Sequence, residues 1–88
     1  MTWTVRRTDT FLESFSRVRD NKTVVTELAK KIRRLQEDPL HVGGWLSGPL
    51  HGKKGTRIAK RYRLVFQPDE REHSVYLILI DHRKNVYG

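Results

Sequence analysis

A dense cluster of basic side chains lies in the second half of the chain. Six of the eleven residues from position 53 to position 63 are lysine or arginine, namely Lys53, Lys54, Arg57, Lys60, Arg61 and Arg63. Side chains of a strand alternate between the two faces of a sheet, so Arg61 and Arg63 are expected on one face, with Arg57 from the preceding strand beside them. Guanidinium groups gathered in this way hold phosphate oxygens through paired hydrogen bonds. The cluster therefore predicts a phosphate-binding surface, although a single lysine in such a run is more often a solvated charge.

A second basic group follows the most apolar segment of the chain. Residues 74–80 read SVYLILI, which is typical of a central strand buried on both faces, and the sequence DHRKNVY comes directly after it. Polar side chains just beyond a buried strand stand on a rigid base, which suits a site of fixed geometry. His82 titrates near neutrality, and Tyr87 offers a flat ring for stacking a base. Taken singly, His82 is more often structural and Tyr87 more often covers a core; together with Arg83 they favour a functional site.

Composition limits the class of protein. The chain has 88 residues, a formal net charge of +8 and no cysteine. A chain of this length has room for one core, so we expect a single domain over residues 1–88. The basic charge attracts polyanions, with nucleic acid first and an acidic protein second. The lack of cysteine excludes disulfides and thiolate metal sites, and the lack of a long apolar run or signal peptide predicts a soluble, cytoplasmic protein.

Signatures of cofactor and metal sites are missing from the sequence. The four histidines have no cysteine partner and no i,i+4 spacing, so we expect no metal site. The segment GKKG at residues 52–55 lacks the first glycine and the preceding strand of a phosphate-binding loop. We therefore expect no cofactor.

The first half of the chain predicts one strand and two helices. Residues 2–6 alternate polar and apolar, which indicates a short strand. Thr10 and Glu13 have capping-box spacing, and apolar residues then recur at helical intervals, so a helix is expected over residues 10–19. The pair Asp20 and Asn21 is expected to end this helix and to cap a second helix that ends before Pro39.

The second half of the chain predicts a loop and three strands. Glycines and a proline interrupt residues 40–55, where Trp45, Leu46 and Leu50 are expected to anchor the loop to the core. Strands are expected over residues 56–59, 62–67 and 74–80. The resulting order, β-α-α-β-β-β, predicts an α+β fold with a helical hairpin packed on a small, mostly antiparallel sheet.

The sequence resembles the RelE/ParE superfamily of bacterial and archaeal toxins over nearly its whole length. The resemblance rests on RYRLVF at residues 61–66, preceded by a GPLHG loop and a short basic strand, and on SVYLILIDHRKNVY at residues 74–87. The YRLVF strand and the terminal HRxxVY pattern are its most specific parts. RelE-like members are implied to be ribosome-dependent endoribonucleases that cut mRNA in the decoding site, whereas ParE-like members poison DNA gyrase.

The resemblance also implies roles for individual residues. Arg63 matches the strand arginine that RelE-like toxins use against the scissile phosphate, and Arg83 resembles a second catalytic arginine. Tyr87 resembles the tyrosine that stacks on or orients the mRNA base. Arg57 occupies roughly the place of a catalytic lysine, and His82 departs from the basic residue often found at its position.

Metal-free RNA cleavage sets the chemistry that these residues must supply. The neighbouring 2′-OH attacks the phosphorus, so the site needs a proton acceptor and cations over the developing charge. Arg63 and Arg83 suit the charge role, because guanidinium stays protonated. His82 or Lys60 is the candidate for proton transfer. Contacts with RNA phosphates are expected from Lys30, Lys31, Lys53, Lys54, Arg61 and Lys84.

The sequence therefore favours a RelE-like mRNA endoribonuclease toxin without a cofactor. Its expected partners are a cognate antitoxin, the ribosome and mRNA, with the toxin itself a monomer within a hetero-oligomeric complex. A ParE-like gyrase inhibitor and an RNA-binding module that does not cut are the alternatives. Only His82, Arg83 and Tyr87 distinguish the nuclease from the gyrase inhibitor, since a purely binding toxin has no chemical need for this group.

Overall fold

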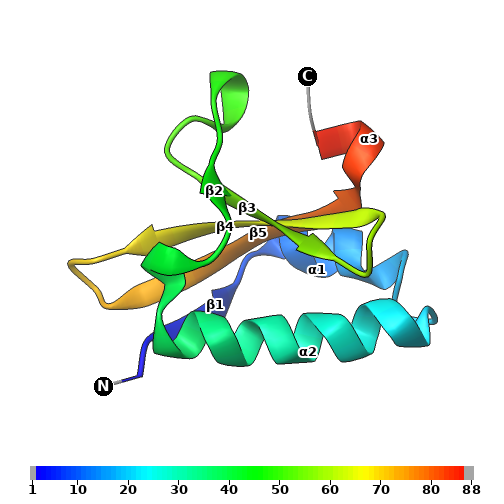
Figure 1. The fold of residues 1–88 in the computed structure, drawn as a ribbon, viewed down its shortest axis with the longest axis horizontal. Coiled ribbons are helices and arrows are strands. Elements are labelled where there is room, and N and C mark those ends of the chain that lie inside the picture. The colour runs from blue at the N-terminus through cyan, green and yellow to red at the C-terminus, as the bar shows by residue number, and fades with distance from the viewer. Residues whose placement is uncertain (1, 87–88) are drawn as a thin grey trace.

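The computed structural model describes residues 2–86, which form one five-stranded sheet with helices on its faces and edge (Figure 1). The strands are β1 (Thr4–Arg7), β2 (Gly44–Trp45), β3 (Lys54–Ile58), β4 (Tyr62–Asp69) and β5 (Ser74–His82). The helices are α1 (Asp9–Ser16), α2 (Lys22–Glu37) and α3 (Arg83–Val86), with short 3-10 turns at Pro39–His41 and Gly48–Leu50. The strand order is β1-β5-β4-β3-β2, and only the β1–β5 pair is parallel. The predicted α+β fold is confirmed, and the structure adds strand β2 and helix α3 to the predicted order of elements.

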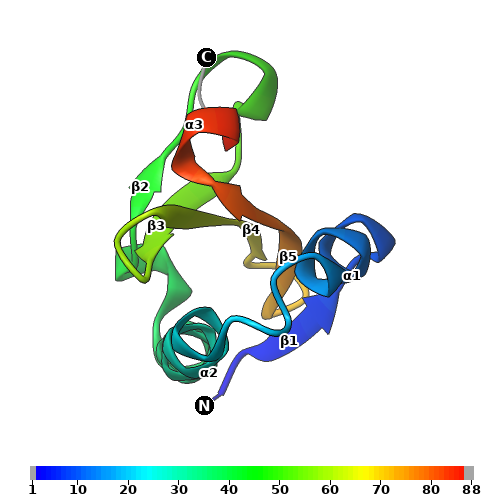
Figure 2. The same ribbon diagram turned by 90° about the vertical axis from the view of Figure 1, so that its right-hand side faces the viewer.

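Helix α2 covers one face of the sheet and closes the core (Figure 2). Leu28 and Leu35 of α2 pack into one cluster with Leu64 and Phe66 of β4, and all four are at most 4% exposed. The cap predicted at Asn21 is confirmed, because its Oδ1 accepts a hydrogen bond from the amide of Val24 at 3.2 Å. The helix ends before Pro39, as the sequence predicts.

Helix α1 lies along β5 where that strand passes beyond its partner β1. Thr8 Oγ1 donates to the carbonyl of Leu77 at 2.7 Å, and the amide of Ile80 donates to Ser14 Oγ at 3.0 Å. These side chains replace the hydrogen bonds of a missing strand, so the edge of β5 is covered. The capping box predicted at Thr10 is wrong: Thr8 caps α1, because its contact with β5 holds its hydroxyl 3.1 Å from the amide of Phe11.

The segment between α2 and β3 differs from its prediction. Residues 44 and 45 form the short strand β2 at the free edge of β3. Trp45 is 62% exposed and does not anchor the segment to the core, whereas Val42 is 4% exposed and does. Gly43 has a φ of +65°, and a Cβ there would collide with the carbonyl oxygen of Gly55, so the close approach of the two glycine backbones excludes larger residues.

An extra residue in β5 changes which of its side chains lie on each face of the sheet. Val65 pairs with Leu79 but its neighbour Phe66 pairs with Leu77, which leaves Ile78 as a bulge. A bulge breaks the alternation of a strand, so Leu77 and Ile80 both enter the core on the α2 side. Residues 79 and 81 consequently face away from α2. Among the described residues, no helix has both the length and the hydropathy to cross a membrane.

Candidate functional site

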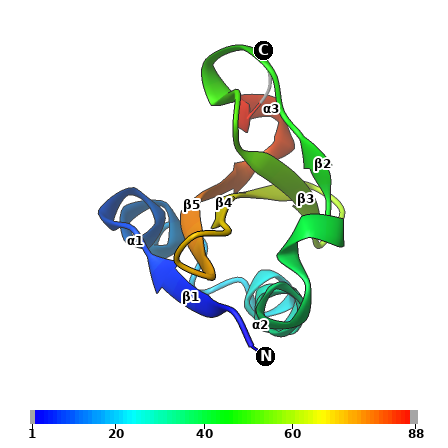
Figure 3. The same cartoon turned by 90° about the vertical axis from the view of Figure 1, so that its left-hand side faces the viewer.

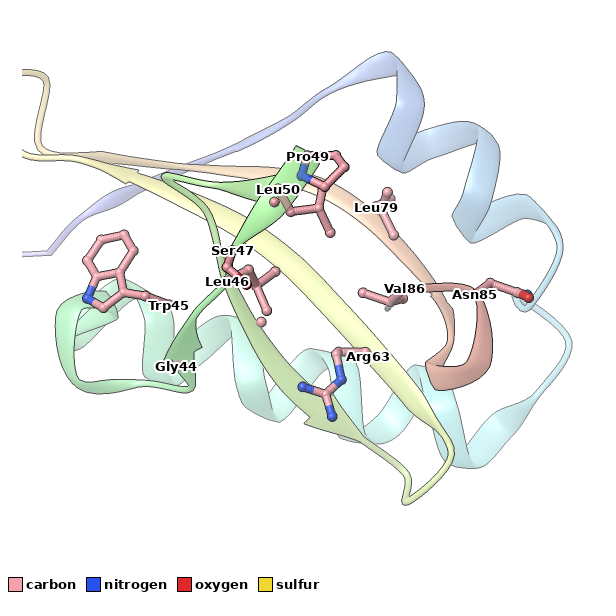
Figure 4. Close-up of a pocket in the computed structure, with 12 residues that line it drawn as sticks. Gly44, Trp45, Leu46, Ser47, Pro49, Leu50, Arg63, Leu79, Asn85 and Val86 are labelled. Carbon is pink, nitrogen blue, oxygen red and sulfur yellow. The ribbon is translucent and has the colours of Figure 1, made fainter. Parts of the chain in front are cut away.

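A cleft of about 810 Å³ lies on the face of the sheet away from α2 (Figure 4). Figure 3 shows α3 and the β2 segment on this side of the sheet. Strand alternation directs Leu64 and Phe66 toward α2, and therefore directs Arg63 to the opposite face. The cleft is lined by Gly44, Trp45, Leu46, Ser47, Gly48, Pro49, Leu50, Gly55, Arg63, Leu79, Asn85 and Val86.

Arg63 is the single charged residue among the described residues that line the cleft. Its cross-strand partners are Arg57 on β3 and Asp81 on β5. Beside it, Gly55 leaves room for the arginine stem, since a Cβ at Gly55 would lie 3.4 Å from Arg63 Cδ and 3.3 Å from Leu46 Cδ2. The walls are mainly apolar, which strengthens the interaction of a guanidinium with a phosphate that displaces water from the cleft.

Hydrogen bonds connect α3 to the end of the sheet. Asp81 Oδ1 accepts from the amide of His82 at 2.7 Å and from Asn85 Nδ2 at 3.2 Å. The amide of Arg83 donates to the carbonyl of Arg61 at 2.8 Å. This arrangement holds Val86 in the cleft wall at 8% exposure. The side chains of Arg83 and Lys84 are exposed and do not line the cleft.

His82 does not join Arg63. Tyr62 and His82 are cross-strand partners one position along from Arg63 and Asp81, so their side chains lie on the other face of the sheet. The rings of Tyr62 and His82 meet edge to face at a centroid distance of 5.7 Å. His82 Nδ1 accepts from the amide of Lys84 at 3.2 Å. The predicted grouping of His82 with Arg63 is therefore wrong, because alternation in the strand separates them.

Lys54 is a structural residue, which corrects its prediction as an RNA contact. Its side chain is 2% exposed, and its Nζ donates to the carbonyl of Leu40 at 2.5 Å. The same ammonium lies 5.0 Å from the centroid of the Trp45 ring. Burial lowers the pKa of Lys54, and the carboxylate of Asp38 partly opposes this shift. The buried ammonium joins β3 to the turn that follows α2.

The remaining basic residues of the predicted cluster lie beside Arg63 only in part: Arg57 is its cross-strand partner, as predicted, whereas Lys60 and Arg61 belong to the β3–β4 turn. Arg61 lies exposed in the β3–β4 turn rather than in a strand beside Arg63. Arg57 and Lys60 do not line the cleft but line a groove of about 440 Å³ against α2. The other residues of this groove are Glu27, Lys30, Lys31, Arg34 and Ala59. The pKa of Lys31 is lowered by burial and by the charge of Arg34, with Glu27 acting in the opposite direction.

Comparison with known proteins identifies the family. No family model matches the chain. A relative named "Putative toxin RelE4" from Methanocaldococcus jannaschii is 34% identical over 79 residues, which are 90% of this chain and 81% of the relative. The chain belongs to the RelE/ParE toxin superfamily. The family resemblance of the sequence is thereby confirmed.

Solved structures agree with this membership. The toxin resembles the crystal structure of the toxin–antitoxin complex RelBE2 from Mycobacterium tuberculosis, with 29% identity, a TM-score of 0.71, and coverage of 94% of this chain and 93% of that one. It also resembles the free E. coli toxin RelE, with 22% identity, a TM-score of 0.78, and coverage of 98% and 88%. The second likeness concerns the fold alone.

Sequence reasoning missed the apolar wall of the cleft in the toxin. Leu79 lines it only because the bulge in β5 reverses the faces, which no periodicity of the sequence signals. Val86 could have been noticed as the apolar residue within the terminal basic group. Tyr87, predicted to stack on RNA, lies outside the described residues. Within residues 2–86, no group of three or more histidine or carboxylate side chains could hold a metal ion.

Proposed function

We propose that the toxin is a ribosome-dependent endoribonuclease that cuts mRNA at the cleft around Arg63. The observation that carries this proposal is that Arg63 is the single charged residue among the described residues that line a mainly apolar cleft, in a chain related to RelE toxins. Attack by the 2′-OH places additional negative charge on the phosphoryl oxygens. Arg63 would stabilise that charge with paired hydrogen bonds, and its stem lies against Gly55, which has no side chain to displace it.

The proposed reaction depends on orientation more than on a strong base. We propose that neither His82 nor Lys60 is the proton acceptor in the cleft, since His82 faces the other side of the sheet and Lys60 lines the groove along α2. Arginine remains protonated and cannot serve as one. Alignment of the 2′-OH with the scissile bond must then supply much of the acceleration, and the ribosome is the agent that holds mRNA in a fixed path. Action on ribosomes assigns the toxin to the cytoplasm.

Single-turnover cleavage on programmed ribosomes tests this proposal. Arg63→Ala is expected to lower the cleavage rate by about a hundredfold with little change in ribosome binding, because one guanidinium acts on transition-state charge. Arg71→Ala is the matched control, since Arg71 is exposed in the β4–β5 turn. Cleavage by Arg63→Ala at the wild-type rate would overturn the site assignment. Growth arrest with intact mRNA and altered DNA supercoiling would instead support a gyrase inhibitor.

We also propose a cognate antitoxin as a partner. The M. tuberculosis neighbour was solved as a toxin–antitoxin complex, and the net charge of +8 of this chain favours an acidic partner. Electrostatic attraction would accelerate their encounter, so the association rate should fall steeply as salt rises. Stopped-flow mixing at low and high salt measures this rate. An association rate independent of salt would exclude electrostatic recognition.

A further inference from the structure

Two adjoining hollows form a basic trough along α2. The groove of about 440 Å³ described above meets a hollow of about 270 Å³ lined by Lys22, Thr23, Thr26, Glu27 and Lys30. They share Glu27 and Lys30, so the trough follows α2 from Lys22 to Arg34. Twelve residues of α-helix, at about 1.5 Å per residue, give the trough a length of about 18 Å. In Figure 1 the β3–β4 turn bends down toward α2, and this turn contributes Lys60.

Positive charge is concentrated in the trough. Six basic residues line the trough with a single acidic one, Glu27; they are Lys22, Lys30, Lys31, Arg34, Arg57 and Lys60. Neither of the ion pairs Arg17–Glu13 and His41–Asp38 involves a residue of the trough. The charge of Arg34 contributes to the lowered pKa of Lys31, which shows that like charges are crowded here. An anion in the trough would relieve this repulsion.

The backbone of the β3–β4 turn is strained next to the trough. Ala59 has a φ of 48° and Lys60 a φ of 65°, and both are left-handed values that are unfavourable for a residue other than glycine. This conformation presents Lys60 to α2 across the groove. Arg57, three residues earlier, lines the groove and is also the cross-strand partner of Arg63, so the β3–β4 hairpin contributes residues to both the trough and the cleft.

The lining of the trough favours nucleic acid over a protein segment. Ala59 is the one apolar residue among the described residues that line either hollow; the others are charged or threonine. An amphipathic protein segment would find no apolar pocket for its side chains, whereas a phosphate backbone needs only cations spaced along its path. We propose that this trough binds the phosphate backbone of an RNA helix, independently of the cleft. The choice of RNA rests on the proposed function.

Binding of a short RNA duplex tests the proposal. The full chain is titrated against a blunt, fluorescently labelled 16-base-pair RNA duplex, and anisotropy is recorded from about 50 to 200 mM salt. The test variant is Lys30→Ala/Lys60→Asn, in which asparagine tolerates the left-handed backbone. The control is Arg6→Ala/Arg71→Ala, which removes the same charge at exposed positions outside the trough. Circular dichroism checks that both variants fold.

The test variant should lose about two units of slope in log affinity against log salt, and at least about tenfold in affinity at the lowest salt. The control should stay within about twofold of the wild type. Equal losses in the two variants would mean that only net charge matters and would overturn the proposal. Unchanged RNA binding by the test variant would also overturn the proposal. If the test variant instead lost binding to a poly-glutamate peptide selectively, the trough would be assigned to an acidic protein and the proposal would fail.

A second measurement separates this inference from the proposed function. Arg63→Ala should bind the duplex with the wild-type salt slope while cleavage on ribosomes is lost. If Arg63→Ala cuts normally and the trough variant still loses duplex binding, the cleavage proposal fails and the trough remains an RNA site. If Arg63→Ala loses cleavage and the trough variant binds RNA normally, the trough inference alone fails.

Discussion

Gly55 leaves space for the side chain of Arg63: a Cβ built on Gly55 would lie 3.4 Å from Arg63 Cδ. The same Cβ would lie 3.3 Å from Cδ2 of Leu46, which also lines the cleft. The position of the guanidinium therefore depends on a missing methyl group one strand away. This relationship makes the cleft sensitive to a change that adds no charge and removes no hydrogen bond.

Replacement of Gly55 by alanine should displace Arg63 and impair cleavage while leaving the toxin folded. The new methyl group requires its neighbours to shift by only a few tenths of an ångström, so the loss of rate should be well below the hundredfold expected for Arg63→Ala. The control is Gly44→Ala, because a Cβ at this cross-strand partner has no heavy atom within 4 Å. Single-turnover cleavage of the two variants checks the prediction. Equal rates for Gly55→Ala and Gly44→Ala would show that the packing around Arg63 adapts without cost.

Ser14→Ala should destabilise the fold by about 1–3 kcal/mol, because the amide of Ile80 would lose its acceptor in a buried position. Ser16→Ala is the control, because Ser16 Oγ donates to the carbonyl of Glu13 in an exposed position. Its cost should stay below about 0.5 kcal/mol. Urea unfolding of both variants measures the difference. Similar midpoints for the two would contradict the role of Ser14 at the edge of β5.

Lys54→Met should cost about 1–3 kcal/mol of stability, since the carbonyl of Leu40 would lose its charged donor. Lys53→Met is the control, because Lys53 is its neighbour but is not buried. If Lys53 contacts phosphates, RNA affinity should fall more in Lys53→Met than in Lys54→Met. A loss of affinity without loss of stability in Lys54→Met would restore Lys54 as an RNA contact.

The lowered pKa of Lys54 also predicts how stability varies with pH. Between the lowered pKa of the folded state and the ordinary value of 10.5, the unfolded chain binds more protons than the folded one. The contribution of Lys54 to the free energy of unfolding should therefore rise with pH in this window. The measurement is the difference in unfolding free energy between the wild type and Lys54→Met from pH 8 to pH 10.5. A difference that falls with pH would mean that the folded state holds the proton more tightly.

Tyr87 tests how far stacking contributes to cleavage. Tyr87→Ala should lower the rate by less than Arg63→Ala, because it misplaces the mRNA without removing charge stabilisation. Tyr87→Phe should keep most of the activity, since the ring is retained. Single-turnover rates of both variants at saturating ribosomes decide this. Equal loss in the two would assign the effect to the hydroxyl group.

The sequence by itself determined the order of the elements and the main core. Helical spacing of apolar residues over α2 and alternation along β4 select Leu28, Leu35, Leu64 and Phe66 for the interior, because burial of apolar surface acts on each element in the same way in any fold. Asn21 could be assigned as a cap because capping involves residues only three positions apart. The RYRLVF and HRxxVY patterns were sufficient to indicate the toxin superfamily.

Only the tertiary structure decided which basic residues share a site. The bulge at Ile78 reverses the faces of β5, which separates His82 from Arg63 and brings Leu79 into the cleft. Lys54 could not be distinguished from Lys53 by sequence, because its partners are carbonyl groups more than ten positions away. Equally, the trough combines α2 with a turn about thirty residues later in the chain. Local sequence patterns specify burial and hydrogen bonding within one helix or strand. A site is made of contacts between elements. The register and the distance between those elements depend on the packing of the whole chain.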